Sequence, residues 1–108
     1  MSKDLILGKN EKEIGHKRSQ LSMDDVIIDF LYDKVKNYPT LWSIVKDYYE
    51  DFSVDADRLQ ILKNEINKFL ISQRKNEKSQ NIHDFLKKLE KLCDEGIKKR
   101  LILWGMAD

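Results

Sequence analysis

Cysteine, proline and glycine are scarce in this 108-residue chain. Cys93 is the only cysteine, so no internal disulfide can form and nothing points to an oxidising compartment. One proline and four glycines are few for a turn-rich β architecture and favour long helices. A chain of this length fits one domain, and 41% hydrophobic with 36% charged residues suits a globular protein.

Long hydrophobic runs are also missing. The apolar run at residues 5–7 is shorter than the roughly 7–15 apolar residues of a secretory signal. No segment approaches the roughly 18 apolar residues of a membrane span. We therefore expect a cytoplasmic protein that does not enter a membrane.

Groups that could carry out catalysis or hold a metal do not cluster in the sequence. His83 and Cys93 would lie about 15 Å apart along one helix, too far for a nucleophile and its base. His16 is remote from both, and no glycine-rich phosphate loop is present. We expect no enzyme, no catalytic residue, no metal site and no cofactor, with Cys93 a small buried hydrophobe.

Helical periodicity appears in four segments. The first is expected to begin at Ser22 and to end before Pro39, because a residue that precedes proline is pushed out of the α region. Thr40 is expected to cap the second, whose apolar stripe runs to Phe52. The third follows a turn at residues 53–57, where an aspartate is expected to cap it.

The fourth helix follows a polar connector at residues 72–81, and Gly96 is expected to end it. Residues 1–21 have no clear assignment, and residues 101–104 remain open between a short strand and a last helical turn. The sequence therefore predicts an all-α protein, a compact bundle of four to five helices, as a single domain over residues 1–108.

Charge is unevenly distributed along the chain. Residues 22–57 contain nine acidic and three basic residues, a net charge of −6, whereas residues 58–108 carry +5. Asp25, Asp29 and Asp33 are spaced four apart, and like charges at this spacing destabilise a helix by about 0.2–0.5 kcal/mol per pair. Either basic groups of the later helices neutralise this row within the fold, or a basic partner does so.

A second acidic run, Asp47-Tyr-Tyr-Glu-Asp-Phe-Ser-Val-Asp-Ala-Asp57, contains five acids and three aromatic residues without a basic residue. A tyrosine flanked by carboxylates suits protein binding, since the ring supplies contact area and the charges steer association. The predicted partner-binding residues are Asp25, Asp29, Asp33, Tyr49, Glu50 and Asp51.

The basic half offers a different interpretation, a nucleic-acid-binding regulator. Acidic residues interrupt its positive charges and no base-reading motif is present, so nucleic acid is disfavoured as a partner. The positive charges in question are Lys63, Lys68, Arg74, Lys75, Lys78, Lys87, Lys88 and Lys91. A homodimeric adaptor bundle is a further alternative.

The last fifty residues resemble the C-terminal half of bacterial immunity proteins of contact-dependent growth inhibition and related polymorphic toxin systems. The resemblance is carried by Leu59, Leu62 and Glu65 in one helix, by Leu89, Leu92, Cys93 and Gly96 in the next, and by the apolar residues 101–104 before Gly105 and Asp108. It implies a non-enzymatic inhibitor that binds a toxin domain, often a nuclease with a basic cleft. Together with the charge count, it leads us to expect binding of a cognate toxin through the acidic face.

Overall fold

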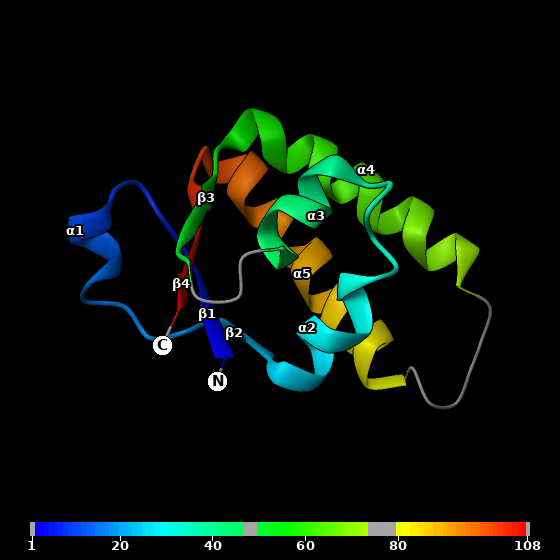
Figure 1. Ribbon diagram of the computed structural model, residues 1–108. Coiled ribbons are helices and arrows are strands. Elements are labelled where there is room, and N and C mark those ends of the chain that lie inside the picture. The colour runs from blue at the N-terminus through cyan, green and yellow to red at the C-terminus, as the bar shows by residue number, and fades with distance from the viewer. Residues whose placement is uncertain (1, 47–49, 74–79, 108) are drawn as a thin grey trace.

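A four-stranded antiparallel sheet forms one layer of the protein, seen in a computed structural model that describes residues 2–46, 50–73 and 80–107. The strands are β1 (Ser2–Gly8), β2 (Leu21–Asp24), β3 (Phe52–Val54) and β4 (Ile102–Ala107), in the order β2-β1-β4-β3. The central pair joins opposite ends of the sequence, with Lys3 opposite Ala107 and Gly8 opposite Ile102. The first and last described residues, Ser2 and Ala107, therefore lie at the same end of the sheet (Figure 1).

Strand β1 is buried on both faces along residues 5–8. Leu5 and Leu7 face the main core on one side of the sheet, and Lys3 shares that side and is only 1% exposed. Its ammonium donates to the carbonyl of Ile44 at 3.4 Å. On the other side, Gly8 leaves the space that the side chain of Ile14 fills.

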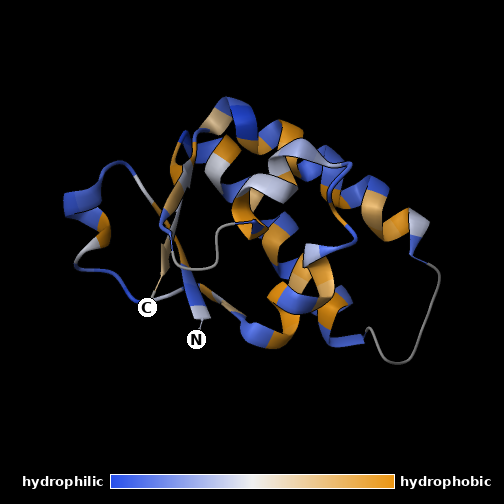
Figure 2. Ribbon diagram, in the orientation of Figure 1, coloured by the Kyte–Doolittle hydropathy of each residue, from blue (hydrophilic) through white to orange (hydrophobic). Residues whose placement is uncertain are grey.

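The helices are α1 (Glu11–Ile14), α2 (Asp25–Tyr32), α3 (Pro39–Val45), α4 (Ala56–Ser72) and α5 (Gln80–Lys99). Helices α2 to α5 lie together on one side of the sheet, whereas α1 projects beyond it at the opposite end of the molecule (Figure 1). Apolar residues of α4 and α5 pack with those of β1 and β4 in one buried cluster, which includes Leu59, Leu62, Leu89 and Leu103. The long helices are accordingly amphipathic, with hydrophobic and hydrophilic residues alternating along their ribbons (Figure 2).

The prediction of an all-α bundle is wrong. Residues 1–21, left unassigned, contain β1, and residues 101–104, left open, belong largely to β4. Phe52, expected on a helical stripe, begins β3. These strands are stabilised by pairing between distant segments, which the periodicity of a single segment does not reveal. The helical-bundle part of the adaptor alternative is wrong for the same reason.

Helix boundaries differ from the prediction at several points. Ser22 lies in β2, and Asp24 caps α2 instead, accepting from the Ile27 N–H at 3.0 Å. Helix α2 ends at Tyr32, well before Pro39, which opens α3 as its first residue. The capping aspartate expected before the third helix is confirmed as Asp55, which accepts from the Arg58 N–H at 2.9 Å.

Gly96 does not end α5. The helix continues to Lys99, and Arg100 follows in the left-handed region at φ 54°. The Leu101 N–H donates to the Gly96 carbonyl at 2.8 Å and the Arg100 N–H to the Ile97 carbonyl, the pattern of a Schellman motif. This turn reverses the chain into β4. Among the described residues, no helix combines the length and apolar character needed to cross a membrane.

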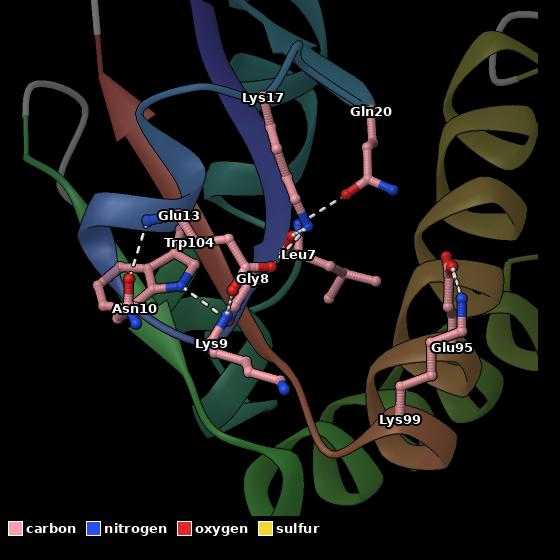
Figure 3. A network of polar contacts seen from close by, with 10 residues as sticks. All are labelled: Leu7, Gly8, Lys9, Asn10, Glu13, Lys17, Gln20, Glu95, Lys99 and Trp104. Carbon is pink, nitrogen blue, oxygen red and sulfur yellow. Dashed lines mark hydrogen bonds and ion pairs between the residues drawn. The ribbon is translucent and has the colours of Figure 1, made fainter.

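Side chains complete the hydrogen bonding of β1 beyond the end of β2. The Leu7 N–H donates to Gln20 Oε1 at 2.6 Å, and Lys17 Nζ donates to the Leu7 carbonyl at 2.9 Å. Trp104 on β4 donates its indole N–H to the Gly8 carbonyl at 3.2 Å. Figure 3 shows how these contacts tie the segment around α1 to the end of the sheet, which protects an otherwise open strand edge.

Candidate functional site

The acidic row of α2 remains together in the folded protein. Asp25 is the first residue of the helix and is half-buried, while Asp29 lies exposed in its middle. Asp33 is the C-cap residue, and its φ of −86° and ψ of −11° keep it on the helical path. Asp29 and Asp33 therefore present carboxylates on one face of α2 to solvent.

The basic residues of the later helices are engaged elsewhere or point to solvent. Lys63 of α4 pairs with Asp94 of α5, and Lys99 pairs with Glu95 within α5. Within the part of the chain that the structure describes, no lysine or arginine of α4 or α5 lies within ion-pair distance of Asp29 or Asp33. The row is thus not neutralised at these two positions by the later helices.

Among the described residues, Asp33 forms one ion pair, with a lysine of the turn that follows the helix. Lys36 Nζ lies 3.7 Å from Asp33 Oδ1, with the two side chains 56% and 80% exposed. An ion pair so exposed contributes little to stability, about 0–1 kcal/mol. Asp33 also carries a negative charge at the negative end of the helix dipole, where it is locally unfavourable.

Two aromatic rings stand next to this ion pair. Tyr32, the last residue of α2, meets Trp42 of α3 edge to face, with ring centroids 5.0 Å apart and planes at 63°. Lys36 Nζ lies 5.5 Å from the centroid of Tyr32 and 5.7 Å from that of Trp42. We call Asp29, Tyr32, Asp33, Lys36 and Trp42 the acidic–aromatic patch.

Sequence reasoning did not identify Tyr32 or Trp42 as parts of the site. The first helix was expected to continue to Tyr38, which would have placed Tyr32 in its interior and far from the second helix. The useful signal was the spacing of Tyr32 three residues beyond Asp29, which places both on one helical face. The contact with Trp42 depends on the turn between α2 and α3.

The second predicted group does not join this patch into one site. Tyr49 lies outside the described residues, and Glu50 is exposed. Asp51 has a structural contact, since its Oδ1 accepts from the Ala107 N–H at 2.7 Å and extends the hydrogen bonding where β3 begins. In Figure 1, β3 forms an edge of the sheet, whereas α2 lies among the helices.

The basic residues considered for nucleic-acid binding differ in their surroundings. Lys63 is tied to Asp94, and Arg74, Lys75 and Lys78 lie outside the described residues. Lys68, Lys87, Lys88 and Lys91 are exposed. Lys91 lies one helical turn beyond Lys87 and Lys88 on α5, so these three lysines are neighbours, and the partly buried Glu90 borders them.

Reactive groups are either buried or isolated. Cys93 is fully buried, and burial, with the negative Asp94 and Glu90 nearby, raises the pKa of its thiol to about 12. His16 and His83 are both exposed, on separate elements. Across residues 2–46, 50–73 and 80–107, no group of three His, Cys, Asp or Glu side chains is arranged to hold a metal ion. The acidic–aromatic patch carries charge, aromatic rings and hydrogen-bond acceptors, with Asp29, Tyr32, Asp33 and Lys36 exposed and Trp42 partly buried.

Comparison of the chain with models of known protein families, with curated proteins and with solved structures finds no match.

Proposed function

We propose that this protein is a bacterial immunity protein that binds a cognate toxin domain one to one and blocks it without turnover. The toxin class that fits best is a nuclease, since a cleft that holds nucleic acid is basic. The observation that carries this assignment is Asp29. It lies exposed in the middle of α2, and no lysine or arginine in the described ranges is within ion-pair distance of it.

Physical chemistry connects this arrangement to a basic partner. A row of like charges on one helix face destabilises the free protein slightly, by about 0.2–0.5 kcal/mol per pair. A positively charged surface would offset that cost on binding, and the same field would accelerate the encounter. Tyrosine and tryptophan are enriched among the residues that dominate protein interfaces, and Tyr32 and Trp42 lie beside the row.

The cytoplasm is the compartment that this function implies, because an immunity protein must meet the toxin domain where the toxin reaches its substrate. The carboxylates of α2 would occupy the positions that phosphates take in a nuclease cleft. Binding of this kind blocks access to substrate without any reacting group on the inhibitor. It needs no cofactor.

The function predicts a toxin domain in the reading frame immediately upstream of this gene, and co-expression with that domain tests it. Cells that produce the toxin domain should grow only when this chain is present, and the purified proteins should form a one-to-one complex by light scattering. A growing culture in the absence of this chain, or the absence of a complex, would remove the immunity function.

Charge reversal tests the surface. Asp29→Lys with Asp33→Lys should slow association with the toxin domain about tenfold or more at low salt, and less at 0.5 M salt. The matched control is Glu11→Lys with Asp57→Lys, which changes the net charge equally in the first turns of α1 and α4, away from α2 (Figure 1). Equal rates for the two double variants would mean that α2 is not the contact.

A nucleic-acid-binding regulator is the second candidate, and one observation favours it. Lys87, Lys88 and Lys91 are exposed on α5, and none forms an ion pair with another described residue. A gel-shift titration with duplex DNA and with RNA at several salt concentrations decides. An apparent affinity that falls steeply with salt and is lost in a triple Lys→Gln variant supports this function, and no shift at low salt removes it.

A further inference from the structure

The acidic–aromatic patch already holds a positive charge. Lys36 reaches back from the turn after α2 and places its ammonium near the rings of Tyr32 and Trp42 and 3.7 Å from Asp33 Oδ1. Two aromatic faces and a carboxylate that converge on one ammonium form a cation-binding site. The chain itself supplies the occupant.

That occupant is weakly held. The Lys36 side chain is 56% exposed, and its partner carboxylate is 80% exposed. The ammonium contacts Asp33 through one oxygen, at a distance beyond ordinary hydrogen bonding. Lysine is strongly hydrated and loses considerable side-chain entropy when it is fixed, so water competes well for Lys36 at this position.

We propose that the Tyr32–Trp42 pair with Asp33 is the seat for an arginine side chain of a basic partner protein, which displaces Lys36. The basic character of that partner rests on the proposed function, whereas the seat itself rests on the observed position of Lys36. Guanidinium fits better than ammonium because it is planar, stacks on aromatic rings and is less strongly hydrated. It also offers a carboxylate two parallel donors, which Lys36 does not.

Asp29 attracts the incoming arginine toward the seat from one side. It lies one helical turn before Asp33 on the same face, exposed, and no cation among the described residues neutralises it. When an arginine enters, Lys36 can swing to solvent, since it belongs to the turn between α2 and α3. Closure by the partner excludes water and strengthens both the ring contact and the ion pair.

Peptide titration tests the seat without the toxin. An acetylated, amidated hexa-arginine peptide is titrated into 15N-labelled protein at low salt, and the two indole N–H signals are followed. The Trp42 signal should shift while that of Trp104, which is bonded to the Gly8 carbonyl on the sheet, should not. Hexalysine should bind about two- to fivefold more weakly, the size expected for a ring contact at an exposed site.

Removing the occupant provides the sharper comparison. Lys36→Ala should tighten hexa-arginine binding about two- to fivefold more than Lys34→Ala does. The control variant makes the same change in net charge, two residues away, where Lys34 lies 4.3 Å from the ring centroid of Phe30. Trp42→Leu should abolish the preference for arginine over lysine. Tyr32→Leu should reduce the same preference, and it serves as the test if the tryptophan variant does not fold.

Failure of the proposed arginine seat and failure of the proposed immunity function would give different results. Equal effects of Lys36→Ala and Lys34→Ala, or a Trp104 shift as large as that of Trp42, would overturn the arginine seat whatever the toxin assay gives. Selective hexa-arginine binding without protection against a toxin would retain the seat and remove the immunity function. Toxin binding that is unchanged by Trp42→Leu and Tyr32→Leu would overturn the seat while leaving the immunity function in place.

Discussion

Glu65 on α4 accepts the backbone N–H of Leu41 on α3 through Oε1, at 2.9 Å. Its second oxygen accepts the Thr40 N–H at 3.1 Å, so one carboxylate caps the start of α3 from another helix. Tyr38, at the N-cap position, provides no side-chain acceptor. Because Trp42 follows Leu41 directly, this contact holds the backbone next to the residue that supplies the indole of the acidic–aromatic patch.

Glu65→Ala should lower the free energy of unfolding by about 2–3 kcal/mol, because two buried N–H donors lose a charged acceptor. Glu65→Gln retains one carbonyl acceptor and should lose roughly half of that. Urea denaturation measures both, and the near-ultraviolet circular dichroism of the folded variants reports whether Trp42 has moved. A loss below about 0.5 kcal/mol for the alanine variant would show that the cap is dispensable.

Asp33 should be unfavourable for the free protein. Asp33→Asn removes a negative charge from the C-terminal end of α2 and should raise the free energy of unfolding by about 0.3–1 kcal/mol at low salt. The gain should shrink at 0.5 M salt because screening weakens the helix dipole effect. Thermal denaturation at the two salt concentrations measures it.

Asp24 supplies the matched opposite case at the other end of the same helix. Its side chain accepts the Ile27 N–H, so Asp24→Ala should cost about 1 kcal/mol. A loss of stability in Asp33→Asn, comparable with that of Asp24→Ala, would mean that Asp33 stabilises the fold. The presence of Asp33 would then be explained by the stability of the fold, without a binding partner.

The helices that the sequence predicted best are those whose signals are local. Helices α4 and α5 follow apolar spacings of three and four, and an aspartate, Asp55, caps α4 as predicted. Strand β1 was not predicted, and residues 101–104 of the β4 region were left open between a strand and a helical turn, because each strand is completed by a partner at the opposite end of the chain. Phe52 shows the same limit, since its place over Gly105 depends on the pairing of β3 with β4.

The candidate site also contains one part that local sequence signals predict and one part that depends on contacts between elements. The row of Asp29 and Asp33 follows from residue spacing within one helix and was predicted. The pairing of Tyr32 with Trp42 crosses the turn from α2 to α3, and Glu65 on α4 caps the start of the helix that carries Trp42. A contact among three elements is set by tertiary packing, so periodicity within any one of them does not reveal it.

Gly96 allows α5 to approach both α4 and the sheet. A Cβ there would lie 2.5 Å from Leu59 Cδ1 and 3.1 Å from Leu7 Cδ2. Gly96→Ala should therefore lower the free energy of unfolding by about 1–3 kcal/mol through overpacking. Gly15→Ala is the matched control, because Gly15 is exposed at φ −60° and a Cβ there meets nothing closer than 3.5 Å.

The control should be neutral or more stable by about 0.4–1 kcal/mol, since alanine restricts the unfolded chain at a compatible backbone position. Chemical denaturation of the two variants under one set of conditions separates packing from the general effect of adding a methyl group. Equal stabilities would indicate that Leu59 and Leu7 relax without cost.

Cys93 should make stability depend on alkaline pH. Its pKa is raised from an ordinary value of 9.0 to about 12 by burial, so the folded protein keeps the thiol protonated where the unfolded chain ionises. This contribution is fully present below pH 9 and is lost as the pH rises toward 12. The stability advantage of the native protein over Cys93→Ala should therefore shrink between pH 9 and 11, which urea denaturation at each pH measures.

At pH 8 the native thiol should react with a disulfide reagent only as fast as the protein opens, and rapid reaction of the folded protein would contradict a buried, protonated Cys93.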